Sequence, residues 1–157
     1  IDGAYWLRKP GPNCDVVIAY QGAVAQEAIA AAGHLSDTRR DVGVLAVTSA
    51  DRLNAGWTAA QRVRARGHEG ATSHIETLLN DLPGSCSIVS VIDGHPAVLA
   101  WLGSVAGHRS ISLGVEHFGQ TGTIQDLYRH YGIDQKGILT AVNGLTKGRP
   151  VPLKSVV

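Results

Sequence analysis

Apolar positions along this chain follow two different rhythms. Short and nearly continuous apolar runs, rich in valine and isoleucine, favour buried β-strands. Between them lie longer stretches in which apolar residues recur every three or four positions, as on one face of a helix. The runs that we predict as strands are 4–7, 16–20, 42–48, 87–92 and 110–115. The segments that we predict as helices are 24–35, 53–66, 75–82, 97–105, 124–131 and 134–142.

The order of these elements predicts the architecture. Strands that alternate with helices pair in parallel, because a crossover between parallel neighbours needs about a dozen residues or more. Strands that are apolar on both faces must be covered on both faces. We therefore expect an α/β fold, a three-layer α/β/α sandwich with a mostly parallel, doubly wound sheet. We expect residues 1–13 to be a linker with the strand that enters the domain, and residues 14–157 to form the domain.

Composition narrows the choice of partners. Of 157 residues, 14 are basic and 13 are acidic, and charged residues make up 17%. This balance gives no electrostatic case for nucleic acid or a membrane surface as a partner, and no apolar run approaches the roughly 20 residues of a membrane span. The low charge indicates that part of the surface is covered by other protein. Because the chain has no methionine and opens on Ile1, we expect either that its start has been removed or that it is a piece of a longer protein.

The two cysteines are Cys14 and Cys86, which lie 72 positions apart without a CxxC motif. Two cysteines are too few for a disulfide framework. We expect both to be reduced thiols in a cytoplasmic protein, with a single bridge between them as the alternative.

Polar residues follow the predicted strands, at the edge where open parallel sheets bind ligands. Asp93 and His95 come directly after one strand, on either side of a glycine. A carboxylate and an imidazole this close can perform acid–base chemistry. The alternative is structural, with Asp93 capping the helix that follows.

The segment from Glu116 to Gly122 is the most distinctive loop of the chain. It leads into the helix predicted to begin near Thr123, and backbone amides at a helix start can bind an anion. The alternative is a loop that packs Phe118, the only phenylalanine of the chain, against a neighbouring surface.

Several familiar motifs are missing from the sequence. The turn Gln21-Gly22-Ala23-Val24 lacks the GxGxxG pattern of dinucleotide sites, and no GxxxxGK[ST] phosphate loop occurs. None of the seven histidines has HExxH or Cys/His zinc spacing, and no serine lies in a GxSxG motif. The residues by themselves indicate a doubly wound domain without a complete catalytic set.

Several segments together resemble a known family. The chain carries the pattern L-G-x-x-x-F-G-x-[ST], which then leads into a helix, a Gly-Ile-Asp turn and a last helix. It resembles the C-terminal domain of the transketolase superfamily, and most closely that of homodimeric pyruvate dehydrogenase E1-type and transketolase-like 2-oxo acid dehydrogenases. The segments that carry the resemblance are 3–7, 44–49, 91–105, 113–122 and 126–134.

The resemblance implies a parent enzyme that binds thiamine diphosphate and Mg²⁺ between two other domains. Such an enzyme decarboxylates a 2-oxo acid or transfers a ketol unit, and an E1 enzyme passes the acyl group to a lipoyl group on an E2 acyltransferase. The GDG…N metal motif of the family is absent from this chain. The family's cofactor-activating glutamate, which belongs to its middle domain, is absent as well. The resemblance thus implies a domain with no cofactor of its own and no catalytic residue, packed against the remaining domains of the parent.

In this family the third domain supports the homodimer and lies near the active-site entrance. The residues that we expect at the entrance, or at an anion site, are His95, His117, Gln120 and Thr121. The residues that we expect at an interface are Trp101 and Phe118.

One segment departs from the family pattern and leaves the substrate open. The E1 enzymes typically show DGFGRSD where this chain has Glu116-His117-Phe118-Gly119-Gln120-Thr121-Gly122. Pyruvate, another 2-oxo acid or a transketolase-like reaction all remain candidates. The alternative from another class of protein is a free-standing α/β domain that binds a small anion at residues 119–123 or has a regulatory role.

Overall fold

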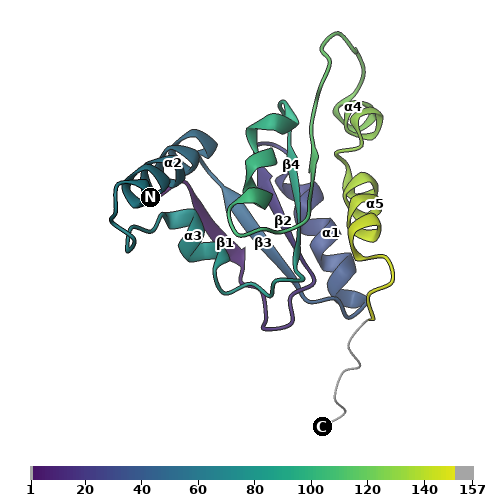
Figure 1. Ribbon diagram of the computed structural model, residues 1–157. Helices are drawn as coiled ribbons and strands as arrows, with labels where there is room; N and C mark the ends of the chain where they lie inside the picture. The colour runs from purple at the N-terminus through teal and green to yellow at the C-terminus, as the bar shows by residue number, and fades with distance from the viewer. Residues whose placement is uncertain (1, 151–157) are drawn as a thin grey trace.

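The computed structural model describes residues 2–150, which form a five-stranded sheet between two layers of helices (Figure 1). The strands are β1 (Ala4–Arg8), β2 (Val16–Gln21), β3 (Val42–Val47), β4 (Ser87–Ile92) and β5 (Ser110–Leu113). The α-helices are α1 (Ala25–Asp37), α2 (Ala50–Ala65), α3 (His74–Leu79), α4 (Ile124–Tyr131) and α5 (Gln135–Thr146). Two short 3₁₀ helices follow β4, η1 (Pro96–Val98) and η2 (Ala100–Ser104). The predicted three-layer α/β/α sandwich is confirmed.

The sheet is doubly wound around its central strand. Its order is β1-β3-β2-β4-β5, and β1 is the one strand of the described residues that runs antiparallel to its neighbour. From β2 the chain passes through α1 to β3 on one side, and it later returns to β4 on the other side. This reversal creates a switch point at the carboxyl ends of β2 and β4, where doubly wound sheets open a crevice for ligands.

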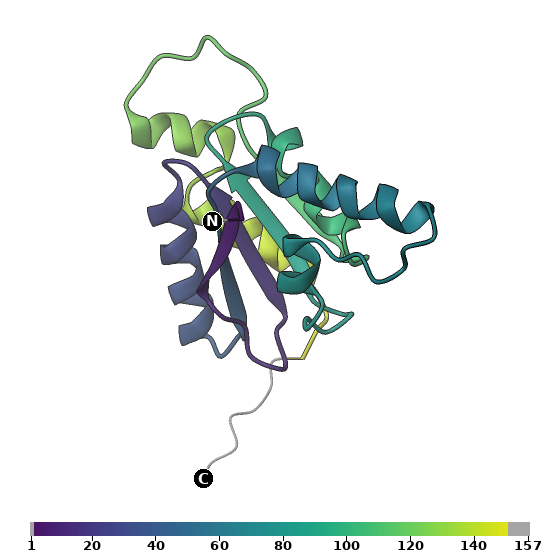
Figure 2. The same cartoon turned by 90° about the vertical axis from the view of Figure 1, so that its left-hand side faces the viewer.

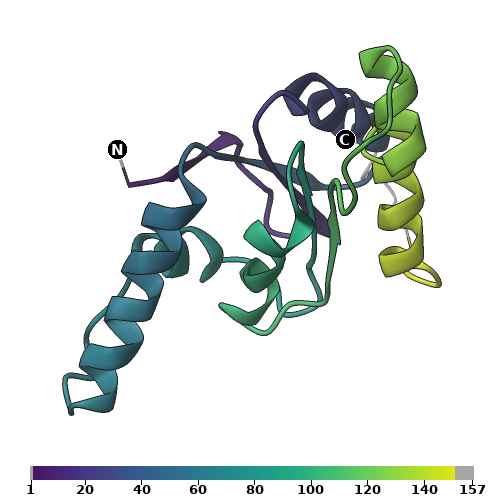
Figure 3. The same ribbon diagram turned by 90° about the horizontal axis from the view of Figure 1, so that it is seen from above.

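Alternate side chains of each parallel strand enter two separate cores. Val17 and Ala19 of β2 belong to the core beneath α2, α3 and η2, whereas Val16 and Ile18 belong to the core beneath α1 and α5. All four side chains are fully buried. Figure 3 shows α2 on one side of the sheet and α4 and α5 on the other. The apolar runs of the sequence therefore reflect a sheet that is covered on both faces.

The strand that enters the domain belongs to the sheet itself. Ala4 of β1 pairs with Val47 of β3, and the Ala4 side chain lies in the α2-side core. The segment 9–13 then leads to β2. The domain boundary between residues 13 and 14 stays a prediction.

Side chains cap the starts of two of the helices. The Ser49 hydroxyl accepts the Arg52 N–H at 3.4 Å at the start of α2. The Asp134 carboxylate accepts the Gly137 N–H at 2.9 Å at the start of α5. Each side chain satisfies one backbone donor that the helix leaves without an internal partner.

The segment 97–105 differs from the single helix that we predicted. It forms η1 and η2, whose bonds span three residues instead of four, such as the Leu102 N–H to the Leu99 carbonyl at 3.2 Å. Close packing explains the tighter winding, because a Cβ at Gly103 would lie 2.3 Å from the Ser110 hydroxyl. The helix prediction is wrong here because contact with β5 decides the local geometry.

The strand predicted over 110–115 ends earlier than expected, at Leu113. Beyond it, the Val115 N–H donates to the Gly94 carbonyl at 2.8 Å. The chain thus leaves the sheet ladder and binds to the turn that follows β4. No helix of the described residues is long and apolar enough to cross a membrane.

Candidate functional site

One carboxylate bridges the switch point of the sheet. Asp93, directly after β4, accepts the Ala23 N–H at 3.1 Å in the turn that follows β2. Gly22 makes this approach possible, because its φ is +87° and a Cβ there would lie 2.1 Å from the carboxylate oxygen of Asp93. Asp93 therefore faces the turn that leads into α1, and the expectation that it caps the helix after β4 is wrong.

His95 takes the capping role that we expected of Asp93. Its Nδ1 accepts the Ala97 N–H at 3.1 Å at the start of η1. A ring nitrogen that accepts a hydrogen bond carries no proton, so the proton of the neutral ring lies on Nε2. Asp93 and His95 serve two different turns, and nothing in their contacts couples them as an acid–base pair.

A pocket of about 230 Å³ opens beside Asp93, between α4 and the loop that precedes it. Figures 1 and 2 show this loop, residues 114–123, standing out at the top of the molecule. Gly114 fixes the base of the loop, since a Cβ there would lie 2.5 Å from the Gly94 carbonyl oxygen. The residues that line the pocket are Asp93, Val115, His117, Phe118, Gln120, Leu127, Tyr128, Tyr131 and Ile133.

Two tyrosines of α4 bring hydroxyl groups to this pocket. The Tyr131 hydroxyl donates to the backbone carbonyl of His117 and ties the loop to the helix. Burial raises the pKa of Tyr128, and the negative charges of Asp93 and Glu27 raise it further. The Tyr128 phenol therefore keeps its proton at neutral pH and can donate a hydrogen bond.

At the same edge of the sheet, the side chain of Gln21 has a buried polar atom without a hydrogen-bond partner in the described part of the chain. It is the last residue of β2 and pairs in register with Ile92, the residue before Asp93. Among the buried side-chain nitrogen and oxygen atoms of the described residues, its Oε1 is the one without a hydrogen-bond partner. An unpaired buried acceptor costs about 1–3 kcal/mol. A donor from a ligand, a water molecule or another domain would remove this cost.

The structure brings some of the predicted entrance residues together and leaves others apart. His117 and Gln120 line the pocket, whereas His95 and Thr121 are exposed and lie outside its lining. Tyr128, Tyr131 and Gln21 were missed by the sequence reasoning. The three-residue spacing of the tyrosines predicts one face of the helix 124–131, but it does not reveal that their polar tips reach a pocket.

The start of α4 is already occupied by its own side chains. The Thr123 hydroxyl accepts the Asp126 N–H at 3.2 Å and donates to the Asp126 carboxylate at 2.7 Å. The negative charge of Asp126 therefore lies at the helix start where an anion would have to bind, and the two negative charges would repel each other. The geometry gives no support to the small-anion site expected at residues 119–123.

The two interface candidates lie in different environments. Trp101 is half-buried, stacks on Trp57 with ring centroids 5.3 Å apart, and donates its indole N–H to the Val98 carbonyl at 2.9 Å. Phe118, by contrast, is 95% exposed at the tip of the loop. Of these two candidates, Phe118 is the one whose apolar surface is free to meet another surface.

The donor groups of this domain do not fit thiamine diphosphate and its metal ion. Among residues 2–150 no group of three or more His, Cys, Asp or Glu is arranged to hold a metal. The carboxylates of Asp93 and Asp126 lie near the starts of α1 and α4, and both would repel a diphosphate.

Comparison with solved structures identifies the fold. A split-gene transketolase, described as an inactive β4 tetramer, has a TM-score of 0.64 at 19% identity over 90% of this chain and 41% of its own. Transketolase from Leishmania mexicana has a TM-score of 0.62 at 22% identity, with 98% of this chain and 20% of its own covered. Transketolase from Campylobacter jejuni has a TM-score of 0.60 at 16% identity, with 91% and 18% covered.

The family follows from the sequence match. No curated protein matches the chain. This chain spans less than half the length of each of these three solved transketolases. Residues 3–134 match the family described as the transketolase-like TK C-terminal domain. With most of its length matched and its fold shared with transketolases, the chain belongs to the transketolase-like C-terminal domain family.

Proposed function

We propose that this chain is the C-terminal domain of a thiamine diphosphate-dependent enzyme, either a 2-oxo acid dehydrogenase E1 or a transketolase-like enzyme. In that enzyme the domain supports a homodimer and shapes the entrance of the active site. Family membership supports the parent class. The solved transketolases are much longer than this chain, which supports placing thiamine diphosphate and Mg²⁺ in other domains. An E2 acyltransferase is a further partner if the reaction is that of an E1.

The exposed apolar side chains at the loop 114–123 are the main support for these two roles. Its Phe118 ring is 95% exposed, and Ile124 just beyond it is 69% exposed. Burial of a large apolar side chain is worth about 1.5–3 kcal/mol, and neighbouring exposed apolar groups mark contact surfaces. The loop thus offers apolar side chains to another surface while His117 and Gln120 line the pocket behind them.

The polar groups of the pocket suit binding and orientation. Gln120 can donate and accept hydrogen bonds, and Tyr128 donates from a phenol that keeps its proton. The carboxylate of Asp93 accepts from hydroxyl groups and repels anionic groups. In the proposed enzyme these side chains guide a substrate, with its anionic group turned away from Asp93, towards a reaction centre that other domains build.

Kinetics of the full-length enzyme test the role at the entrance. We expect Gln120→Ala to raise KM about two- to tenfold with kcat little changed, because one hydrogen bond worth about 0.5–1.5 kcal/mol is lost from substrate binding. Gln125→Ala is the matched control, since Gln125 is exposed at the start of the neighbouring helix α4 and lies outside the lining of this pocket. Equal KM values for the two variants and the wild type would contradict a role of this pocket at the active-site entrance.

Subunit association tests the role in the dimer. We expect Phe118→Ser in the full-length protein to raise the dimer dissociation constant about tenfold or more, as truncation of a buried aromatic anchor does. Sedimentation at graded protein concentrations measures this constant. Val63→Ser, on the exposed face of α2, serves as the control. If Phe118→Ser associates as tightly as the control, the loop is not part of the dimer interface.

A further inference from the structure

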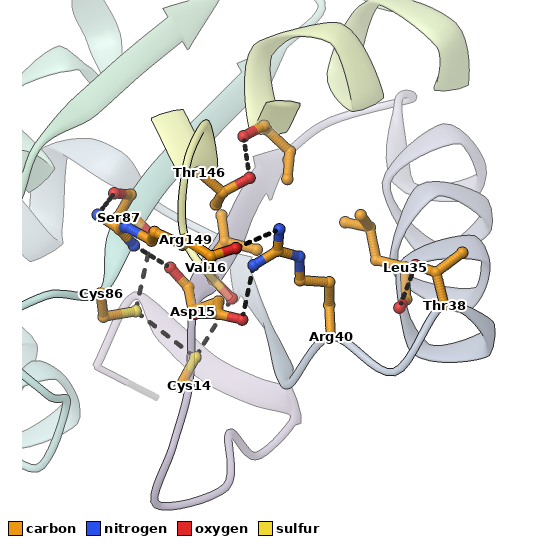
Figure 4. A network of polar contacts seen from close by, with 11 residues as sticks. Cys14, Asp15, Val16, Leu35, Thr38, Arg40, Cys86, Ser87, Thr146 and Arg149 are labelled. Atoms are coloured by element: carbon orange, nitrogen blue, oxygen red, sulfur yellow. Dashed lines mark hydrogen bonds and ion pairs between the residues drawn. The ribbon is translucent and has the colours of Figure 1, made fainter. Parts of the chain in front are cut away.

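The fold brings the two cysteines together at the amino edge of the sheet. Cys14 comes shortly before β2 and Cys86 directly before β4, and these strands are parallel neighbours. Their sulfur atoms lie 3.5 Å apart, and Figure 4 shows the two side chains pointing toward one another. Neighbouring strands are spaced about 4.8 Å apart, and a disulfide spans Cα atoms about 4.4–6.8 Å apart. The two thiols therefore meet at the ends of neighbouring strands whose spacing falls within the range that a disulfide spans.

One guanidinium clamps the two backbones beside the sulfur atoms. Arg149 donates to the Asp15 carbonyl at 3.1 Å and to the Ser87 hydroxyl at 3.0 Å. The Ser87 N–H also donates to the Asp15 carbonyl at 3.0 Å. Asp15 and Ser87 directly follow Cys14 and Cys86, so these bonds hold the two cysteines next to each other (Figure 4).

The two thiols have different proton affinities. The hydrogen bond from the Cys86 thiol lowers the pKa of Cys14, and backbone contacts at Gly43 and Val16 add to this effect against the cost of burial. The same contact with Cys14, together with burial, raises the pKa of Cys86. Cys14 therefore loses its proton first and becomes the nucleophile, and Cys86 gives up its proton only when it attacks in the second step.

The surroundings favour a small, uncharged oxidant. Cys14 is 2% exposed and Cys86 is 1% exposed, within the α2-side core. Both are preceded by breaker residues, Lys9-Pro10-Gly11-Pro12-Asn13 on one side and Pro83-Gly84 on the other. The first of these segments and α3 line a pocket of about 490 Å³. Local opening of such loops costs less than opening of the sheet.

We propose that Cys14 and Cys86 are a modification site that forms a reversible intrachain disulfide, with hydrogen peroxide as oxidant and a dithiol as reductant. The Cys14 thiolate attacks one peroxide oxygen, the O–O bond breaks, and hydroxide leaves, which makes Cys14 a sulfenic acid. The Cys86 sulfur then attacks the Cys14 sulfur, the S–O bond breaks, and the oxygen leaves as water with the proton of Cys86. The two thiols lose two electrons and two protons, and the peroxide becomes two water molecules. A dithiol returns both cysteines to thiols by exchange.

Peptide mapping of the full-length chain tests the proposal without any variant. After brief treatment with hydrogen peroxide, free thiols are blocked with iodoacetamide and the protein is digested with trypsin. We expect peptides 9–39 and 67–109 to be joined within one chain, about 2 Da lighter than their sum, and to separate with dithiothreitol. Recovery of both peptides as alkylated free thiols, or of Cys14 as a sulfinic acid beside a free Cys86, would overturn the proposal.

Two further measurements separate a built site from a chance contact. In Cys86→Ser the peroxide should leave Cys14 as a sulfenic acid, which dimedone traps, and the wild type should show far less trapping because Cys86 resolves it. Equal trapping in both proteins contradicts the proposal. The bridge should also raise the melting temperature of this domain by roughly 10 °C, because it closes a long loop in the unfolded chain. A lower melting temperature after oxidation would show that the fold does not accommodate the bridge.

Discussion

Gly22 and Asp93 show how two residues far apart in the sequence make one joint at the switch point. Asp93 accepts a hydrogen bond from the turn after β2, and Gly22 in that turn has the positive φ and the free space that this contact needs. The sequence places Asp93 at a strand end and offers it as a helix cap. It does not reveal which turn the carboxylate serves, because the partner lies 70 positions away and becomes a neighbour only through the strand order.

Replacement of Gly22 tests this joint. We expect Gly22→Ala to lower the free energy of unfolding by about 2–4 kcal/mol, because the positive φ costs about 1–2 kcal/mol and the new Cβ displaces Asp93. Gly67→Ala is the matched control, since Gly67 has a φ of +96° with nothing within 4 Å of its Cβ position. Urea unfolding compares the two variants. Equal losses would mean that the contact with Asp93 contributes nothing to stability.

The thiol pair makes a second prediction, on the pH dependence of alkylation. The Cys86 thiol is the largest cause that lowers the pKa of Cys14, so Cys86→Ala should move the pH midpoint for alkylation of Cys14 upward. Cys14 is the largest cause that raises the pKa of Cys86, so Cys14→Ala should move the midpoint for Cys86 downward. Mass spectrometry of each peptide after timed alkylation measures both. Shifts in the same direction would contradict the pairing.

At the scale of elements, the corner between α4 and α5 positions the pocket. Gly132 ends α4 with a φ of +66°, and Ile133 is buried directly after it. Asp134 then caps α5 through the Gly137 N–H. The Gly-Ile-Asp turn was predicted from the sequence because each of its residues has a local role that its type reveals, namely a left-handed C-cap, a core anchor and an N-cap.

Gly137 gives a prediction for this corner. A Cβ there would lie 2.0 Å from the Gly132 carbonyl oxygen, whereas a Cβ at Gly144 in the same helix meets nothing within 4 Å. We expect Gly137→Ala to lower the free energy of unfolding by about 2 kcal/mol or more, since α4 and α5 must move apart. Gly144→Ala should raise it by about 0.5–1 kcal/mol, as alanine favours helices. Thermal unfolding, followed by circular dichroism, measures both changes. A Gly137→Ala variant that is more stable than the wild type would contradict the close packing of Gly137 against Gly132.

Other elements were predictable only in part. The buried strands followed from their apolar runs, because a strand covered on both faces needs apolar side chains throughout. The segment 97–105 looked helical by the same kind of reasoning, yet Gly103 lets it press against Ser110 and wind into η1 and η2. That contact joins parts of the chain whose approach depends on the register of β4 and β5. Likewise, nothing in the spacing of Cys14 and Cys86 indicates their contact.

At the scale of the molecule, several surface features of the domain are typical of contact with another protein surface. Phe118 and Ile124 are exposed beside the pocket, and the Gln21 amide oxygen is buried without a partner. The carboxylates near two helix starts oppose a diphosphate in this domain. The low charge of the chain, which indicated a covered surface, agrees with a proposed parent enzyme whose other domains hold thiamine diphosphate.

The most direct test of this account is the titration of thiamine diphosphate with Mg²⁺ by calorimetry into two proteins, the full-length chain and residues 1–157 expressed alone. Circular dichroism first establishes that the shorter protein is folded. We expect saturable binding by the full-length protein and no binding by residues 1–157 at the same concentrations. Stoichiometric binding by residues 1–157, or the lack of binding by the full-length protein, would contradict it.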